Sequence, residues 1–385
     1  MRGRTAWLSA LGMGLVAAGA ASAASPDGTT ALRVEQVRHD PMVLSDVDAA
    51  PVEISFRLIQ PARVWIHLYD VRDLEIRTLH PEGLLPAGDH SVEWDARDQK
   101  GRPVPPEAYL YTIELEGADK ERQTWDLSDL TGGDLLAVRN LKWNAKTRML
   151  SYRLPGPSRV RLRVGLENHG PMLATPIDWV ARGSGSHEEP WDGRDRSRVL
   201  DFSTHAGLEF RIDVFALPRN AIVVGPAAPR PVVIEDLSSK ASRRPRSEIK
   251  GPRRVFDPAA QPFAERRDFE VEIRFPGDLR RSADGAVQVD GPVAVEVSVA
   301  DAEMASIIAS RCEVAFYVDG LFLFEAESGF LPTTWNWDPA SLAPGVHYLT
   351  VNIIGYEGYS GTGTHKVVVL PARSSEAGRR QVLQE

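Results

Sequence analysis

The fold is decided by the stretch GDHSVEWDARD, residues Gly88–Asp98, because the chain repeats it once. The second copy, GSHEEPWDGRD, occupies Gly185–Asp195 and lies 97 residues further on. Upstream, ISFRL at Ile54–Leu58 is echoed by LSYRL at Leu150–Leu154, at an offset of 96 residues. Two features that recur in one order at nearly one offset indicate a duplicated unit. Its length is that of a β-sandwich domain and exceeds the repeat period of solenoid proteins.

The rest of the chain has the same strand-like pattern. Short runs alternate apolar and polar residues and end at Gly, Pro, Asn or Asp, which is typical of β-strands. Helical periodicity is absent apart from one possible short turn at Glu303–Ser310. The pattern predicts an all-β protein of three tandem immunoglobulin-like β-sandwich domains joined by linkers. The expected strands are Val52–Ile59, Arg63–Tyr69, Tyr109–Leu115, Arg159–Val164, Phe210–Phe215, Val293–Val299, Val314–Val318 and Tyr348–Ile354.

A third unit, of different sequence, follows the duplicated pair between Phe269 and Pro371. Asp319-Gly320 lies between two apolar runs, and this dipeptide predicts a hairpin with a type I′ turn. A chain of 385 residues has room for two to four domains. The expected limits are a signal peptide at 1–23, a lead-in at 24–48, domain 1 at 49–118, a connector at 119–145, domain 2 at 146–235, a basic linker at 236–266, domain 3 at 267–371 and a disordered tail at 372–385.

The first residues have the pattern of a secretory leader. Arg2 and Arg4 precede a short apolar run, Leu8–Ala23, which ends in the small-residue cleavage pattern Ala-Ser-Ala. The run is shorter than a membrane span needs, so an uncleaved anchor helix is the weaker alternative. We expect a protein that is exported to the periplasm or cell surface and does not span a membrane after cleavage.

The single cysteine, Cys312, excludes an internal disulfide, a CxxC metal pair and a CxxCH haem site. No cysteine follows the expected cleavage site, which argues against a lipoprotein. Strand alternation favours a buried, inert thiol over a reactive one. The formal net charge of −8 argues against a nucleic-acid surface.

The first unit resembles the immunoglobulin-like domain of the flagellar hook-capping protein (FlgD). The resemblance covers about 65 residues and rests on the following segments: Ser55–Leu58, Val64–Tyr69, Leu84–Gly88, His90, Trp94-Asp95, Asp98, Gly101 and Ala108–Tyr111. Ala96 and Glu107-Ala108 depart from it, since that family usually has glycine there. The second unit keeps Trp191–Asp195 but lacks the closing G-x-Y-x-Y strand, and we expect Phe210–Phe215 to replace it.

The third unit is similar to bacterial immunoglobulin-like or cadherin-like modules. Such modules imply adhesion, spacing or assembly. Hook capping is not implied, because the leader and the lack of that family's other segments argue against it.

The repeated Trp-Asp signature has two interpretations. An aspartate after a strand can accept backbone N–H groups and close a turn, while the tryptophan packs on the core. Alternatively, Asp95 with Asp98, or Asp192 with Asp195, are weak candidates for calcium ligands, although calcium takes six to eight oxygens. The turn interpretation is preferred. Its structural motif comprises Trp94, Asp95, Asp98, Trp191, Asp192, Gly193 and Asp195.

Other polar and aromatic residues also have a structural and a functional interpretation. His90, His187 and His347 follow glycines and favour turns over metal binding. Glu188 and Glu189 point to opposite faces of a strand and are expected in a solvated loop rather than in acid–base chemistry. Four aromatics of the third unit favour packing over sugar stacking: Trp335, Trp337, Tyr356 and Tyr359.

The basic linker is interpreted as a hydrophilic spacer, with docking to an acidic protein, lipid headgroups or anionic polysaccharide as the alternative. Its possible docking residues are Arg243, Arg244, Arg246, Lys250, Arg253 and Arg254. No interleaved aromatics suggest nucleic-acid binding.

No fingerprint of a hydrolase, nucleotide-binding or metalloenzyme site is present. We therefore predict a non-catalytic scaffold of the bacterial envelope, without cofactor or metal, that contacts other envelope proteins. A carbohydrate-binding or adhesion protein of the cell surface is the main alternative. A hydrolase with scattered catalytic groups is the third hypothesis. Fold alone does not choose among them.

Overall fold

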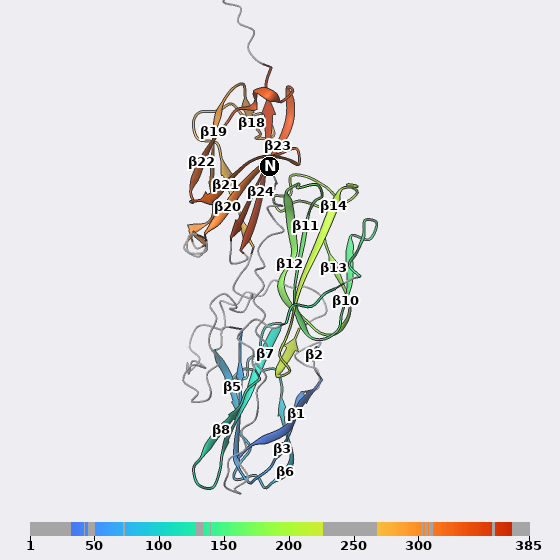
Figure 1. Ribbon diagram of the computed structural model, residues 1–385, viewed down its shortest axis with the longest axis vertical. Coiled ribbons are helices and arrows are strands. Elements are labelled where there is room, and N and C mark those ends of the chain that lie inside the picture. The colour runs from blue at the N-terminus through green and yellow to red at the C-terminus, as the bar shows by residue number, and fades with distance from the viewer. Residues whose placement is uncertain are drawn as a thin grey trace, which may run out of the picture.

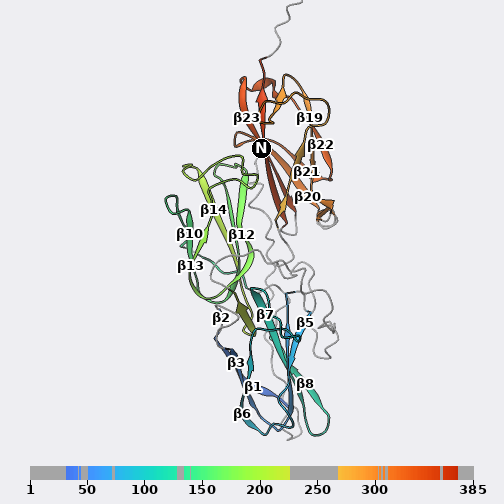
Figure 2. The same ribbon diagram turned by 180° about the vertical axis from the view of Figure 1, so that it is seen from behind.

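The computed structural model describes residues 32–41, 43–44, 51–71, 74–127, 134–138, 140–225, 268–301, 303–304, 307, 311–355 and 359–371. The predicted leader 1–23, basic linker 236–266 and tail 372–385 lie outside these residues. The regular elements of the described chain are almost all strands, and three sandwiches follow one another along its long axis (Figures 1 and 2). None of its helical residues forms a segment that could cross a membrane. The predicted all-β fold class is confirmed.

The first sandwich packs two sheets around one core. The smaller sheet has the order β1-β3-β6, and the larger has the order β2-β15-β7-β4-β5, with β8 also pairing β7. Alternation along β3 turns Val52, Ile54 and Phe56 inward and Glu53 and Arg57 outward. The strands are β1 (Val34–Asp40), β2 (Val43–Leu44), β3 (Val52–Leu58), β4 (Arg63–Tyr69), β5 (Glu75–Leu79), β6 (Gly88–Trp94), β7 (Glu107–Glu116), β8 (Arg122–Trp125) and β15 (Ala221–Val224).

Strand β15 belongs to the first sandwich although it follows the second one in the chain. It pairs antiparallel with β7 and parallel with β2. All four of its side chains are buried, as expected for a continuous apolar run in the interior of a sheet. Asn220, just before it, donates from Nδ2 to the Tyr111 carbonyl at 2.7 Å. The expected domain limits differ from this pairing, because they assign β15 to domain 2 and leave β1 and β8 outside domain 1.

The second sandwich is formed by one sheet of order β13-β10-β9 and another of order β12-β11-β14. Strand β14 pairs along the whole of β11, as β7 pairs along β4 in the first sandwich. The segment Phe210–Phe215 therefore takes the place of the missing G-x-Y-x-Y strand. The strands are β9 (Lys142–Asn144), β10 (Met149–Leu154), β11 (Ser158–Leu166), β12 (Met172–Arg182), β13 (Gly185–Pro190) and β14 (Leu208–Ala216).

The third sandwich has one sheet of order β16-β24-β23-β20-β21, with β18 also pairing β24, and one of order β17-β19-β22. Asp319 and Gly320 have φ of 51° and 82°, so the predicted hairpin turn is confirmed. Cys312 is buried, and burial raises the pKa of its thiol. The strands are β16 (Phe269–Glu270), β17 (Glu272–Arg274), β18 (Val287–Val289), β19 (Val293–Ser298), β20 (Cys312–Val318), β21 (Leu321–Gly329), β22 (Thr333–Trp337), β23 (Gly345–Gly355) and β24 (Ser360–Val369).

A buried ion pair lies inside the second sandwich. Glu189 on β13 is 0% exposed, and its two oxygens accept from the Arg182 guanidinium at 2.7 and 3.1 Å. The Tyr152 hydroxyl donates to the same carboxylate at 3.0 Å. Its neighbour Glu188 is exposed on the opposite face of the strand. The expectation of a solvated loop is therefore wrong for Glu189, because Arg182 on the adjacent sheet neutralises it.

We expect Glu189→Ala to lower the free energy of unfolding by about 3–5 kcal/mol, because it leaves the buried Arg182 guanidinium without its counter-charge. Glu188→Ala is the matched control and should change stability by less than about 0.5 kcal/mol. Urea denaturation followed by tryptophan fluorescence measures both. Equal effects of the two substitutions would contradict the role of the ion pair.

Candidate functional site

The two tryptophans of the repeated signature close the turns that follow their strands. Trp94 Nε1–H donates to the Arg97 carbonyl at 3.0 Å, and Trp191 Nε1–H donates to the Arg194 carbonyl at 3.0 Å. Both rings are buried, and Trp94 packs edge-on against Tyr109 with ring centroids 5.5 Å apart. Each indole thus fills the core with its rings while its N–H fixes the path of the next residues.

The aspartate after each tryptophan accepts a hydrogen bond from the backbone N–H two residues on. The distance from Oδ1 to nitrogen is 3.1 Å for Asp95 and 2.9 Å for Asp192, which is the geometry of an Asx turn. The residue directly after each aspartate has a positive φ, which is 53° at Ala96 and 79° at Gly193. The left-handed backbone at this position explains the glycine of the second copy, and alanine there costs about 1 kcal/mol.

The second aspartate of each signature organises the loop beyond the turn. Asp98 Oδ1 accepts the backbone N–H groups of Lys100 and Arg102 at 2.9 Å, and Oδ2 pairs with the Arg102 guanidinium at 2.7 Å. Burial acts to raise the pKa of Asp98, but the hydrogen bonds and charge of Arg102 outweigh it and lower the pKa. In the second copy Asp195 accepts the Leu200 N–H at 2.5 Å, and burial raises its pKa.

The four carboxylates proposed as weak calcium ligands are thus engaged in turns. Within the described ranges, no three His, Cys, Asp or Glu side chains gather as a metal ion would require. The six basic linker residues offered as docking candidates, Arg243, Arg244, Arg246, Lys250, Arg253 and Arg254, lie outside those ranges.

Three histidines share one turn contact. The Nε2 atoms of His90, His187 and His347 each lie within hydrogen-bond distance of the carbonyl four residues earlier, at 2.8, 2.8 and 2.7 Å. A glycine with positive φ precedes each histidine by two residues, with φ of 132° at Gly88 and 148° at Gly345. These imidazoles fix the start of a strand, and the same imidazole–carbonyl contact occurs in all three sandwiches.

The aromatic residues of the third sandwich are engaged in packing. Trp337 is buried, while Trp335 lies against Phe316 with ring centroids 4.6 Å apart and stacks on Phe324 at 6.0 Å. Tyr359 packs against the core, and Tyr356 lies outside the described residues.

An open groove of about 660 Å³ lies beside the repeated turn of the first sandwich. Arg77 lines the groove and donates to Asp95 Oδ1 at 2.7 Å and to the Arg97 carbonyl at 3.1 Å. Gln99 accepts the Thr78 N–H at 3.1 Å. The lining residues are Arg77, Thr78, Leu79, His80, Pro81, Ser91, Val92, Asp95, Asp98, Gln99 and Gly101.

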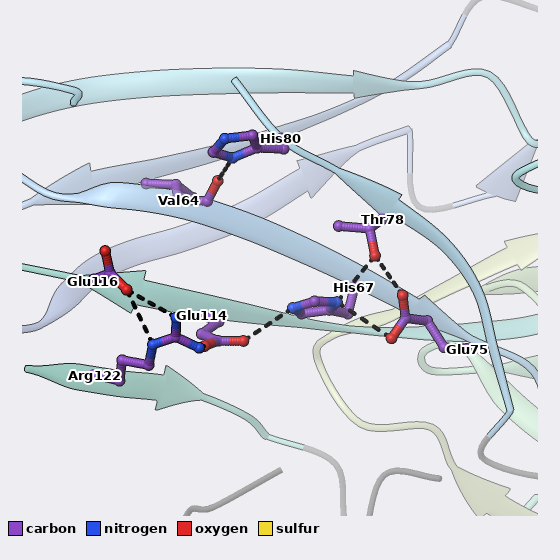
Figure 3. Close-up of polar contacts among 8 residues, drawn as sticks. All are labelled: Val64, His67, Glu75, Thr78, His80, Glu114, Glu116 and Arg122. Carbon is purple, nitrogen blue, oxygen red and sulfur yellow. Dashed lines mark hydrogen bonds and ion pairs between the residues drawn. The ribbon is translucent and has the colours of Figure 1, made fainter. Parts of the chain in front are cut away.

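A charged network borders this groove on the outer face of the larger sheet, where side chains of β4, β5, β7 and β8 meet (Figure 3). His67 Nε2 lies 3.2 Å from Glu114 Oε2, and His67 Nδ1 lies 3.4 Å from Glu75 Oε2. Thr78 on β5 contacts both His67 and Glu75. Arg122 pairs with Glu114 at 2.9 Å. The groove and the network therefore share Thr78.

The imidazole of His67 is held in its charged form. Burial acts to lower its pKa, but the hydrogen bonds and charges of Glu114 and Glu75 outweigh burial and raise the pKa to about 9. A histidine charged at neutral pH donates from both nitrogens and is no general base. Nearby, His80 stacks on Trp65 with ring centroids 4.8 Å apart, and the Arg122 guanidinium lies 5.8 Å from the Trp65 ring.

The repeated motifs did not single out His67, because its partners come from two other strands, β5 and β7. In the sequence, Trp65 and His67 alternate along one strand, and Glu114 and Glu116 alternate along another. That these side chains share one face of the sheet is evident only once β4 is paired with β7.

The second copy also has a charged network on this sheet. Arg161 and Arg163 of β11 pair with Asp213 of β14 at 3.2 and 3.0 Å, and Arg161 lies over the Trp179 ring at 4.4 Å. In the first copy, two carboxylates, those of Glu75 and Glu114, flank the charged His67. In the second copy, arginines flank a single carboxylate, so the signs of the charges are exchanged.

The surface that the described residues leave open in the first copy is covered in the second. Gln99 N–H donates to the Ile76 carbonyl at 2.8 Å, and Arg196 N–H donates to the Leu173 carbonyl at 2.8 Å. These bonds occupy equivalent positions, so β12 and the turn after Asp195 correspond to β5 and the turn after Asp98. The third sandwich packs on β12 and on the turn after Asp195.

Several side-chain contacts make this joint. Asn352 of β23 accepts the Met172 N–H at 2.7 Å and donates to the Met172 carbonyl at 2.9 Å. Thr362 donates to the same carbonyl at 2.9 Å, and the Thr364 N–H donates to Ser197 Oγ at 2.9 Å. Met172, Asn352 and Thr362 are buried. The repeated unit thus carries a surface that binds a neighbouring sandwich.

These features define an all-β protein of tandem immunoglobulin-like sandwiches. No family model matches the chain, and no curated protein matches it. Among solved structures, FlgD from P. aeruginosa is 24% identical over 22% of this chain and 61% of that chain, with a TM-score of 0.19. The match thus spans about three fifths of that FlgD chain.

Two other similar structures cover most of the chain. The fibronectin(III)-like modules of Clostridium thermocellum CbhA are 8% identical over 88% of this chain and 94% of that chain, with a TM-score of 0.19. A tetra-tandem repeat from the extending region of a large adhesion protein is 14% identical over 88% of this chain and 74% of that chain, with a TM-score of 0.17. Likenesses of this size assign no function.

We expect His67→Gln to lower the free energy of unfolding by about 2 kcal/mol at pH 6. The folded-state pKa of about 9 exceeds the ordinary value of 6.5. The stabilisation is therefore complete below pH 6.5 and disappears as the pH rises through 9. Denaturation curves of both proteins between pH 5 and 10 measure it. A stability difference that stays constant with pH would contradict a charged His67.

Proposed function

We propose that the protein is an exported, non-catalytic scaffold of the bacterial envelope, and that the open groove of its first sandwich binds a partner protein. One observation carries the proposal: the equivalent surface of the second copy already binds a sandwich. The first copy keeps the turn, the strand and their mutual hydrogen bond, and none of the described residues covers this surface. The resemblance to modules of adhesion and assembly, stated from the sequence, agrees with this role.

The joint between the first and second sandwiches supports a rigid scaffold. The chain leaves the first sandwich after β8 and returns to it as β15, so two chain segments cross the joint. Arg159 on β11 pairs with Glu107 on β7 at 2.9 Å, and both side chains are largely buried. Ala108, Ala181 and Val223 form a small apolar cluster at the same place. Two covalent connections and a buried ion pair oppose rotation of one sandwich against the other.

The joint between the second and third sandwiches is polar but water-excluding. Asn352 satisfies both backbone groups of Met172, which would otherwise be edge groups of β12. Thr175 and Ser360 also donate to opposite oxygens of the Asp268 carboxylate. Separating these surfaces would leave several buried hydrogen-bonding groups without protein partners, at about 1–3 kcal/mol each unless water replaces them.

The titratable clusters support a non-catalytic role. His67 is charged between two carboxylates, Glu189 is neutralised by Arg182, and Asp98 is saturated by backbone donors and Arg102. Catalytic acids and bases need a pKa near the working pH. The pKa of His67 is instead raised and that of Asp98 lowered by their neighbours, and Glu189 is paired with Arg182, as in a structural network.

We expect Asn352→Ala to loosen the joint between the second and third sandwiches, because the Met172 N–H and carbonyl lose their partners. The free energy of unfolding should fall by about 2 kcal/mol. Small-angle X-ray scattering should show a broader distribution of interatomic distances. Asn336→Ala, at an exposed position of β22, is the matched control. Unchanged scattering of the Asn352 variant would contradict a joint held by these bonds.

We expect the full-length mature chain to capture a partner from envelope extracts in fixed stoichiometry. Ser91→Trp fills the groove without removing any hydrogen bond described above, and it should abolish capture. Glu188→Trp changes the equivalent exposed position of the second copy and should retain capture. Affinity purification with quantitative mass spectrometry measures both. A chain that captures no protein, or equal capture by both variants, would contradict the proposed function.

A further inference from the structure

An edge strand of the third sandwich exposes four consecutive large apolar side chains. Leu321 is 72% exposed, and the three residues after it are exposed by 48%, 43% and 43%. These residues, Leu321–Phe324, begin β21, which is the outermost strand of its sheet. Phe330, just past the strand, is 79% exposed. Contiguous exposed apolar surface of this kind marks an interaction site in a folded protein.

The backbone of β21 is available on one side. Among the described strands it pairs only with β20, and an irregularity at Leu323 shifts the register between Phe316 and Tyr317. The other edge of an antiparallel strand presents N–H and carbonyl groups that a further strand can pair. Strand addition uses these groups for affinity and the neighbouring side-chain sites for specificity.

An aromatic surface adjoins this edge. Phe324 stacks on Trp335 of β22, with ring planes 10° apart, and Trp335 in turn contacts Phe316. Strand β22 is the outermost strand of the opposite sheet, so the two edges border the same open side of the sandwich (Figures 1 and 2). Trp335 is only partly buried and Phe324 is exposed. An added strand could therefore place an apolar side chain on these rings.

Acidic side chains follow the apolar run. Glu325 and Glu327 continue β21, and Glu313 lies on the neighbouring strand β20. Burial raises the pKa of Glu325, and the charge and hydrogen bond of Glu313 and the charge of Glu327 raise it further. Within the described residues no ion pair joins Glu325 or Glu327 to a cation. A basic side chain placed here would relieve the repulsion among these carboxylates.

We propose that β21 binds an extended segment of a partner protein, which adds as a further strand and carries apolar side chains followed by lysine or arginine. The apolar side chains cover Leu321–Phe324, and the basic ones face Glu325 and Glu327. A second copy of this chain fits less well. An antiparallel register of self-pairing that sets Glu325 of one copy opposite Glu327 of the other would bring like charges together across the sheet, which destabilises it.

This inference goes beyond the proposed groove on the first sandwich, because a different surface and a different kind of ligand are involved. Failure of one therefore leaves the other standing. The two sites are also separable by variants, since Ser91 lies on β6 and β21 lies in the third sandwich.

The test uses the full mature chain and three fluorescein-labelled peptides that match the nine residues of β21. One has valines in the half that meets Leu321–Phe324 and valine alternating with lysine in the half that meets Glu325 and Glu327. One has glutamate in place of lysine, and one is the lysine peptide with alternate backbone nitrogens methylated. Fluorescence anisotropy measures binding. We expect the lysine peptide to bind at least about 10-fold more tightly than either of the others, which is the effect of about 1.4 kcal/mol. Amide hydrogen exchange in Leu321–Glu327 should slow when it binds.

Charge reversal provides the decisive variant. Glu325→Lys with Glu327→Lys should reverse the preference between the lysine and glutamate peptides. Glu53→Lys with Glu93→Lys makes the same change of net charge at exposed, mutually paired positions of the first sandwich and should leave the preference intact.

Three outcomes would overturn the proposal. Equal binding of the methylated peptide would exclude strand addition. An unchanged preference in the Glu325, Glu327 variant would exclude these carboxylates. A concentration-dependent dimer that Phe322→Lys abolishes, seen by sedimentation, would identify a second copy as the occupant.

Discussion

The hydrogen bond from the indole N–H of Trp94 to the Arg97 carbonyl, repeated from Trp191 to Arg194, is the interaction on which the remaining structure depends. It anchors the chain to the core where the strand ends, so the next residues cannot continue along the sheet. The loop that follows is then held by Asp98 or Asp195. In one copy this loop lines an open groove, and in the other it contacts the third sandwich. One local contact thereby positions both interaction surfaces.

Divergence of the two copies explains why one surface is covered and the other open. Met172 and Ala174 of the second copy stand where the first has Glu75 and Arg77. Met172 and Ala174 let another sandwich approach the backbone of β12 closely. Glu75 and Arg77 are charged, and they are held by His67 and Asp95, respectively. A desolvated sandwich face would have to strip water from these ions, so the first copy resists the contact that the second copy makes. Its groove suits a partner with polar groups.

The local part of this fold could be predicted from the sequence, and the long-range part could not. Alternation placed strands such as Arg63–Tyr69, and the Asp319-Gly320 dipeptide placed a hairpin, because both depend on neighbouring residues. The Asx contacts of Asp95 and Asp192 are equally local. The pairing of β15 with the first sandwich could not be predicted, because an apolar run of four residues indicates only that the strand is buried. The His67 network needs the register of four strands, and the Asn352 joint needs the packing of two domains.

Edge strands impose a further constraint on a row of sandwiches, because each open edge presents unpaired backbone groups. The chain manages the edge at β12 by covering it with Asn352 and Thr362, and the edge at β5 lies beside ionised side chains. Charge next to an edge discourages pairing with other strands.

Strand β21 departs from this pattern, because its exposed half is apolar and its carboxylates begin only at Glu325. Four exposed apolar residues in a row are costly in contact with water, which favours a binding role over an accident of folding. The adjacent carboxylates repel another copy and attract a basic segment, so the same residues limit self-association and select the ligand.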